Sequence, residues 1–259
     1  MTVGERFADE LWVCHLGTVP YRDALAMQNA LRARRQAGEL PDMLVLLEHP
    51  PVYTRGRRSA DGDLRLGEDF YRAKGIEVID SDRGGRLTYH GPGQLVGYPI
   101  MAVEDIGRFL RTIEGAIVAA LAEEGVEARA RPQDGPDYTG VWVGERKIAS
   151  IGLHLSRGVS THGFAVNVDN DLEPFCWIVA CGLASVSMTS LALEAGTAGS
   201  SLPCFRKRAA HSFCRAQGRR QRLVWPPRLG IADTHAAGLA AERAPIKTIE
   251  PTRAEPVPA

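Results

Sequence analysis

Residues 144–169 read GERKIASIGLHLSRGVSTHGFAVNVD and contain two strand-like segments joined by a turn. Apolar and small residues dominate 147–155 and 163–168, and the Arg157-Gly158 pair between them is typical of a turn. Another strand-like segment, 141–143, comes just before them. Strands separated only by turns do not follow the strict strand-helix alternation of a Rossmann-type sheet.

The rest of the chain interleaves helices with strands. The pattern predicts strands at 11–16, 43–47, 77–80 and 95–101, and helices at 20–38, 68–74 and 106–124. Residues 48–58, EHPPVYTRGRR, contain a proline pair and are predicted to be a surface loop. The sequence therefore predicts an α+β domain.

Composition and charge exclude several classes of protein. The 259 residues are 44% hydrophobic, 7% aromatic and 24% charged, which indicates one sizeable or two small soluble globular domains. Lys and Arg number 31, as do Asp and Glu, so no net charge draws the molecule to nucleic acid or to an anionic membrane. We therefore expect neither as a partner.

The five cysteines lie apart without a CxxC pair, which argues against a disulfide framework and a structural zinc site. No spacing of the HExxH kind suggests another metal site. No apolar run reaches about 18 residues, and the N-terminus MTVGERFADE lacks the pattern of a secretory signal. These features predict free thiols, no metal and a cytoplasmic protein.

The chain changes character after about Ser200, where Ala, Arg and Pro dominate and apolar periodicity is weak. We expect one domain over residues 1–200, then a divergent basic segment with a disordered tail over 201–259. Residues 195–232 hold eight Lys or Arg and no acidic residue. This local excess of positive charge leaves open an anionic partner for the segment.

The most unusual local feature is RGGRLTYHGPGQ at residues 83–94, with four glycines and one proline. Glycines permit close approach of the backbone to a ligand, and Arg83, Arg86, Tyr89 and His90 supply charge and hydrogen bonds. The stretch matches neither the dinucleotide fingerprint nor the phosphate loop. It is therefore interpreted as either a tight β-turn or a ligand-binding loop, with no nucleotide implied.

Cys181 precedes Gly182 in WIVACGLAS, so a ligand can approach its thiol closely. The thiol is either a nucleophile or an inert core residue. Lys147 begins a predicted strand and is either an exposed charge or, if it lies against Cys181, a group that favours the thiolate. His162 is interpreted as a structural histidine. The spacing along the chain does not decide between these alternatives.

Three blocks of the chain occur together in a fixed order. They are RGGRLTYHGPGQLVGYPI at 83–100, GVWVGERKIASIGLHLSRGVSTHGFAVNVDNDL at 140–172, and PFCWIVACGL at 174–183, followed by MTSL. With this order and spacing, residues 11–193 resemble the octanoyltransferase family of lipoate biosynthesis. The resemblance implies the biotin/lipoate protein ligase-like α+β fold, with a mixed β-sheet flanked by helices.

The resemblance also implies a two-step acyl transfer, with Cys181 as nucleophile and Lys147 as its partner, and with no cofactor. Ala180 stands where the family usually has proline before the nucleophile. Leu153, Phe164 and Tyr89 are expected as apolar walls of the acyl pocket. The substrate-binding residues implied by the resemblance are Arg83, Gly84, Gly85, Arg86, Leu87, Thr88, Tyr89, His90, Ser150, Ile151, Gly152, Gly163, Phe164 and Ala165.

The partners implied by the resemblance are octanoyl-acyl carrier protein as donor, and two kinds of acceptor. The acceptors are the lipoyl domains of 2-oxoacid dehydrogenase E2 subunits and the glycine cleavage H protein. We hypothesise that Arg55, Arg57 and Arg58 form a basic rim that docks the acidic carrier. Two alternatives stay open: an ATP-dependent lipoate or biotin ligase, and a non-catalytic acyl-binding protein of the same fold.

Overall fold

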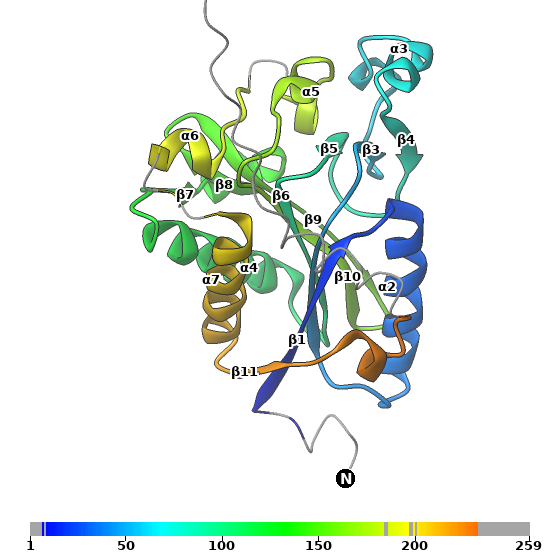
Figure 1. The fold of residues 1–259 in the computed structure, drawn as a ribbon, viewed down its shortest axis with the longest axis vertical. Helices are drawn as coiled ribbons and strands as arrows, with labels where there is room; N and C mark the ends of the chain where they lie inside the picture. Colours follow the sequence, from blue (N-terminus) through cyan, green and yellow to red (C-terminus); the bar gives the residue numbers. More distant parts are fainter. Residues whose placement is uncertain (1–6, 8, 184–185, 197–198, 200, 233–259) are drawn as a thin grey trace, which may run out of the picture.

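An eight-stranded mixed sheet forms the centre of the molecule (Figure 1). The computed structural model describes residues 7, 9–183, 186–196, 199 and 201–232. The strand order is β11-β1-β2-β6-β10-β9-β8-β7, in which β11, β1 and β2 are parallel and the remaining neighbours antiparallel. The strands are β1 (Glu10–Thr18), β2 (Met43–Glu48), β6 (Gln94–Ile100), β7 (Arg129–Ala130), β8 (Gly140–Val143), β9 (Arg146–Ser156), β10 (Val159–Asn167) and β11 (Arg220–Leu223).

Helices cover both faces of this sheet (Figure 1). On one face lies α2 (Tyr21–Gln36), whose Ala24 and Leu31 pack in one buried cluster. On the other face α4 (Ile106–Ala122) and α7 (Leu202–Ala216) pack against each other in a second cluster. Shorter helices are α3 (Glu68–Ala73), α5 (Glu173–Cys176) and α6 (Leu191–Ala195). The predicted α+β class, with a mixed sheet flanked by helices, is confirmed.

Residues 52–55, expected within a surface loop, instead form the central strand of a smaller sheet. This sheet has the order β4-β3-β5, with β4 (Glu77–Asp80), β3 (Val52–Arg55) and β5 (Thr88–His90). The prolines at 50 and 51 precede β3, so neither interrupts its hydrogen bonds. Tyr53 is fully buried, and its hydroxyl donates to the carbonyl of Pro174 at 2.6 Å. The prediction of a loop is therefore wrong for these four residues.

Apolar periodicity is weak in the sequence after Ser200, yet residues 202–216 form the amphipathic helix α7. The expectation of an irregular segment is therefore wrong for these residues. Phe205, Ala209 and Phe213 recur at four-residue spacing and pack against α4, while the intervening basic residues obscure the pattern in the sequence. Pro203 lies in the first turn, where a helix tolerates it. The expected disordered tail, beyond residue 232, lies outside the described residues, and the division at residue 200 stays a prediction.

Several positive charges of this segment meet carboxylates of the body. Arg219 pairs with Asp42 at 2.7 Å and Arg222 with Glu10 at 2.9 Å. Arg208 pairs with a carboxylate that follows α4. The excess of charge seen in the sequence is thus partly neutralised in the fold, which weakens the case for an anionic partner.

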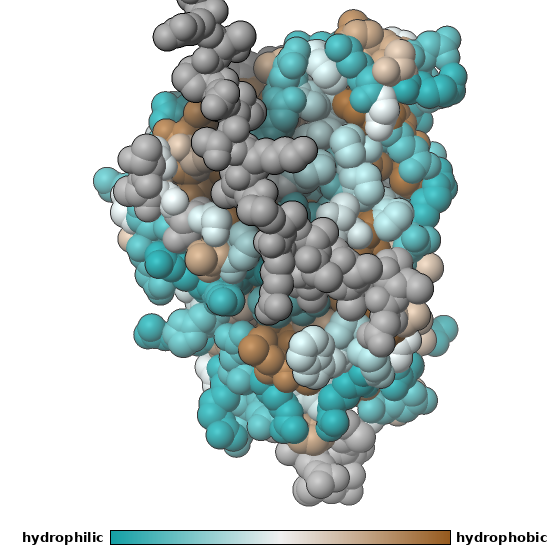
Figure 2. Space-filling view, viewed as in Figure 1, coloured by the Kyte–Doolittle hydropathy of each residue, from teal (hydrophilic) through white to brown (hydrophobic). Residues whose placement is uncertain are grey.

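The surface of the described residues is mostly hydrophilic on the face shown in Figure 2, where hydrophobic side chains form small separate groups. Within the described part of the chain, no helix is both long and apolar enough to cross a membrane. The five cysteines are free thiols, as predicted.

Candidate active site

A cavity of about 290 Å³ brings residues from distant parts of the chain together around Cys181. Its walls come from the glycine-rich stretch, from β9 and β10, from α2 and α4, and from the segment before β8. The lining residues are Tyr21, Arg58, Arg83, Gly84, Gly85, Arg86, Thr88, His90, Val96, Tyr98, Ile106, Leu110, Pro136, Asp137, Thr139, Lys147, Ser150, Ile151, Gly152, Leu153, His162, Gly163, Phe164, Ala165 and Cys181.

Cys181 lies in a short 3₁₀ turn, Ala180–Gly182, with a left-handed backbone. Its φ is +57°, an uncommon value for a residue with a side chain. The amide of Cys181 donates to the carbonyl of Leu87 at 3.0 Å, which ties the turn to the glycine-rich stretch. Surrounding contacts therefore hold the thiol in a conformation that the isolated chain disfavours.

Lys147 and Cys181 are in contact. Lys147 Nζ donates to Cys181 Sγ at 3.2 Å, and Lys147 is only 1% exposed. Burial alone raises the pKa of the Cys181 thiol, but the charge and hydrogen bond of Lys147 outweigh it, with smaller help from Ser150 and Arg83. The net effect is a lowered pKa, which favours the nucleophilic thiolate. Of the two interpretations of Lys147 from sequence, the structure supports contact with the thiol.

A β-bulge brings a second group of β9 to the same sulfur. In the register with β8, Trp142 faces Lys147 while Val141 faces Ala149, so Ile148 is an extra residue. In a regular strand, residues three apart point to opposite faces. Here Lys147 and Ser150 both reach the thiol, with Ser150 Oγ 3.8 Å from Sγ.

The glycine-rich stretch divides between pocket and core. Arg83, Gly84, Gly85, Arg86, Thr88 and His90 line the cavity. Leu87 and Tyr89 point away from it and pack in the core of the smaller sheet with Phe175, because side chains alternate along the strand. The structure therefore does not bring Leu87 and Tyr89 to the cavity lining, and their expected contact with the acyl group stays a prediction.

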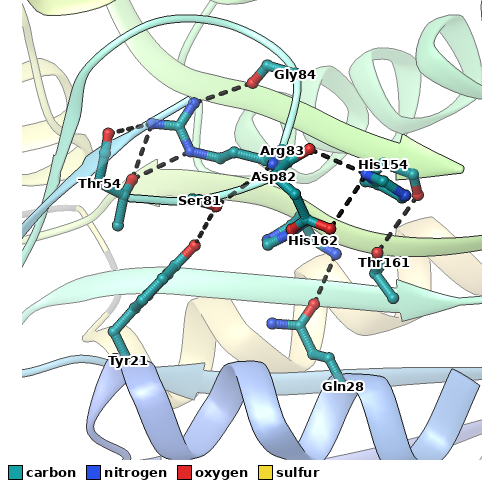
Figure 3. Close-up of polar contacts among 10 residues, drawn as sticks. All are labelled: Tyr21, Gln28, Thr54, Ser81, Asp82, Arg83, Gly84, His154, Thr161 and His162. Carbon is teal, nitrogen blue, oxygen red and sulfur yellow. Dashed lines mark hydrogen bonds and ion pairs between the residues drawn. The ribbon is translucent and has the colours of Figure 1, made fainter. Parts of the chain in front are cut away.

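Arg83 anchors this stretch from within. The side chain is 8% exposed, and Nη2 donates to Thr54 O at 2.6 Å and to Thr54 Oγ1 at 2.8 Å (Figure 3). Its Nη1 donates to the carbonyl of Gly84 at 3.0 Å. Arg83 therefore joins β3 to the pocket wall, besides placing a positive charge near Cys181.

The predicted residues of β9 and β10 all line the cavity. They are Ser150, Ile151, Gly152, Gly163, Phe164 and Ala165. Gly152 and Gly163 face each other across the two strands. A Cβ at Gly163 would lie 2.0 Å from the carbonyl oxygen of Gly97, so only glycine lets β6 approach here.

Residues 20–213 match the lipoyl protein ligase A/B catalytic domain family. An octanoyltransferase from Rubrobacter xylanophilus is 49% identical over 184 residues, which covers 70% of this chain and 81% of that protein. One from Solibacter usitatus is 48% identical over 186 residues, covering 70% and 83%. The chain belongs to the octanoyltransferase family.

Solved structures place the octanoyltransferase fold of this chain beside that of lipoate ligases. Lipoate-protein ligase A bound with ATP has a TM-score of 0.72 at 18% identity, covering 90% of this chain and 93% of that one. A bipartite lipoate protein ligase from Thermoplasma acidophilum has a TM-score of 0.66 at 18% identity, with 90% and 91% covered. At these identities the likeness concerns the fold alone.

His162 is a pocket residue of this octanoyltransferase-family chain that the sequence interpretation missed. It is 2% exposed and lines the cavity, with φ +56°. Its Nε2 lies 2.7 Å from Asp82 Oδ1, and its amide donates to Gln28 Oε1 at 2.6 Å (Figure 3). Burial lowers the pKa of His162 despite Asp82, while the hydrogen bond to His162 lowers the pKa of Asp82 to about 2. Both shifts favour a neutral imidazole beside an ionised carboxylate at neutral pH.

Other pocket residues gave no signal in the sequence. Tyr21 and Tyr98 line the cavity from α2 and β6, and Asp137 from the segment before β8. No local motif in the sequence marks these three positions. In the described residues, no group of three or more His, Cys, Asp or Glu side chains could hold a metal ion.

Gly140→Ala is expected to destabilise the protein and to slow alkylation of Cys181. Gly140 has φ +139°, and an added Cβ would lie 2.3 Å from Ala149 O and 2.7 Å from Lys147 Cε. We expect the free energy of unfolding to fall by about 1–3 kcal/mol. Chemical denaturation and the iodoacetamide rate measure the two effects. Gly144→Ala is the matched control, since Gly144 has φ +57° and open space around the added Cβ. Equal effects of both variants would contradict the claim that the methyl group added at Gly140 acts through its contacts with Ala149 and Lys147.

Proposed function

We propose that this chain transfers an octanoyl group from octanoyl-acyl carrier protein to a lysine of a lipoyl domain through a thioester on Cys181. Membership of the octanoyltransferase family supports the reaction class. The single observation that carries the mechanism is the 3.2 Å contact between Lys147 Nζ and Cys181 Sγ within the cavity. Such a pair supplies both a nucleophile and a proton carrier at one place.

In the first half-reaction the Cys181 thiolate attacks the carbonyl carbon of the donor thioester. The new carbon–sulfur bond forms as the bond to the carrier sulfur breaks, and the departing thiolate takes a proton from the Lys147 ammonium. One thioester replaces another, so the donor itself supplies the activation. The step therefore requires neither ATP nor a metal ion.

In the second half-reaction the acceptor lysine, as a neutral amine, attacks the acyl carbon. The neutral Lys147 amine takes up the proton that the nucleophile releases, and Cys181 leaves as thiolate. An amide forms and the Cys181–Lys147 pair returns to its starting state. The 1% exposure of Lys147 keeps this proton exchange away from bulk water.

The acyl chain is assigned to the part of the cavity along β9 and β10. Ser150 lies beside Cys181, and β9 lines the cavity at every position from Ser150 to Leu153. At a strand rise of about 3.3 Å per residue, this wall is about 10 Å long, of the same order as an extended octanoyl chain. Ile151 and Phe164, both buried, add apolar surface.

The acceptors remain as expected from the resemblance: lipoyl domains of 2-oxoacid dehydrogenase E2 subunits and the glycine cleavage H protein. A cytoplasmic location stays a prediction. The non-catalytic alternative rested on the divergent segment after residue 200, and α7 now lies in the core against α4. That alternative therefore has no structural support left.

The test is octanoylation of an apo lipoyl domain by purified protein and octanoyl-acyl carrier protein with no ATP present. Mass spectrometry of the domain should show one added octanoyl group on its lysine. The same assay with free octanoate and ATP examines the ligase alternative. Transfer that requires ATP would exclude the proposed reaction.

Arg57→Glu is expected to raise the KM for octanoyl-acyl carrier protein about fivefold at low salt. Of the three arginines proposed as a basic rim, Arg55 pairs with Glu68 and Arg58 with Asp137. Arg57 is exposed and has no ion pair among the described residues, so it is the most available to an acidic carrier.

Steady-state kinetics at two salt concentrations measure this effect, which should shrink as salt screens the charges. Arg72→Glu, an exposed reversal on α3 away from the cavity, is the control. An unchanged KM for Arg57→Glu at low salt would count against the rim.

A further inference from the structure

The cavity lining is rich in positive charge. Lys147, Arg58, Arg83 and Arg86 all line it. Among the lining residues in the described part of the chain, Asp137 is the one carboxylate. The acceptor of the proposed reaction is a lysine, which arrives in water as an ammonium ion. The positive charges repel such a group, and Asp137 is placed to offset that repulsion.

Asp137 lies close to the nucleophile. It belongs to a 3₁₀ turn, Pro136–Tyr138, that contacts the turn Ala180–Gly182 around Cys181. Both residues line the same cavity. A cation held by this carboxylate therefore lies in the cavity that contains the thiol.

An ion pair occupies Asp137 before any acceptor arrives. Arg58 Nη1 lies 3.0 Å from Asp137 Oδ1, with the two side chains 47% and 40% exposed. Arg58 is fixed to the opposite wall, because its amide donates to Gly85 O at 3.0 Å and its carbonyl accepts from Arg86 Nε at 3.1 Å. The pair thus joins two walls of the cavity. Because both side chains are partly exposed, the pair is weak enough to exchange partners.

We propose that Asp137 is the binding site for the acceptor lysine, which displaces Arg58 from this carboxylate as the lipoyl domain docks. One cation replaces another, so the carboxylate remains paired throughout. The captured ammonium releases one proton to water, and the neutral amine then attacks the thioester while Lys147 takes up the second proton as the amide forms. This inference rests on the proposed function and concerns only its second half-reaction.

The test separates the two half-reactions. Acyl-enzyme is prepared with octanoyl-acyl carrier protein, and its transfer to apo lipoyl domain is followed in a single turnover by intact mass. For Asp137→Asn we expect the enzyme to be acylated at the normal rate. Transfer of the octanoyl group should be about tenfold slower when the lipoyl domain is present at a subsaturating concentration. Hydroxylamine, a neutral nucleophile, should cleave the acyl-enzyme of this variant at the wild-type rate.

Two further variants distinguish binding of a cation by Asp137 from a purely structural role of this residue. Asp134→Asn removes a carboxylate from the same segment that pairs with Arg131 and does not line the cavity, and it should leave transfer unchanged. In the double variant that exchanges both charges, Arg58→Asp with Asp137→Arg, transfer to the lipoyl domain should remain slow. Recovery of wild-type transfer in that double variant, or wild-type transfer in Asp137→Asn, would overturn the inference. Absence of any acyl-enzyme in the wild type would instead overturn the proposed function.

Discussion

Cys181→Ala is expected to lower octanoyl transfer by at least about 10³-fold, because the thioester intermediate can no longer form. The substitution removes one sulfur atom from a residue whose backbone amide is bound to Leu87, so the turn should persist. Transfer is measured as octanoylation of an apo lipoyl domain. Circular dichroism and thermal unfolding check that the fold is retained.

Cys176→Ala is the matched control for this loss. Cys176 is an exposed thiol at the end of α5, five residues before the nucleophile and outside the cavity lining. It should retain wild-type transfer. Comparable losses in the two variants would show that the effect of Cys181→Ala is structural, and substantial transfer in Cys181→Ala would place the nucleophile elsewhere.

Lys147→Met is expected to raise the pKa of the Cys181 thiol and to slow its alkylation at pH 7 about tenfold or more. Burial raises this pKa, and the Lys147 charge and hydrogen bond are the main forces that lower it. Methionine keeps much of the side-chain volume in a site that is 1% exposed, but it carries no charge. The remaining effect of burial then disfavours the thiolate.

The measurement is the rate of reaction with iodoacetamide as a function of pH. In the wild type the midpoint should lie below that of an ordinary thiol, and in Lys147→Met it should move to higher pH. Arg146→Gln, which removes the neighbouring exposed charge on β9, should leave the midpoint in place. An unchanged midpoint in Lys147→Met would remove Lys147 from the activation of the nucleophile.

Most of the large sheet could be predicted because its strands and turns are determined by residues close together in the sequence. The segments around β9 and β10 are divided by Arg157-Gly158, and both strands form, with β9 close to its predicted bounds and β10 beginning at Val159, before its predicted start at 163. The same holds for α4, whose apolar stripe is continuous and whose start is capped by Asp105. Such elements need no knowledge of distant residues.

The elements that the sequence missed depend on tertiary contacts. The short strand β3 is stabilised by its neighbours β4 and β5 and by the buried Tyr53, while the adjacent prolines point to a loop. In α7, the basic residues dilute an apolar stripe that becomes evident only against α4. Local preference and long-range packing disagree at both places, and packing prevails.

The residues of the candidate active site also differ in whether local sequence or tertiary contacts determine them. The resemblance named Cys181 and Lys147, and the fold brings them to 3.2 Å although they are 34 positions apart in the sequence. The extra residue at Ile148 and the left-handed φ of His162 arise from strand register and from contacts with Gln28 and Asp82, which no local pattern encodes. The orientation of the pocket side chains therefore could not be predicted from sequence.

The most direct measurement of the central claim is intact-mass analysis of the wild-type protein after brief mixing with octanoyl-acyl carrier protein, without ATP, followed by addition of apo lipoyl domain. We predict one octanoyl group on the protein, mapped to Cys181 by peptide sequencing, which then moves to the lysine of the domain. No mass increase, or an increase mapped to another residue, would contradict the account.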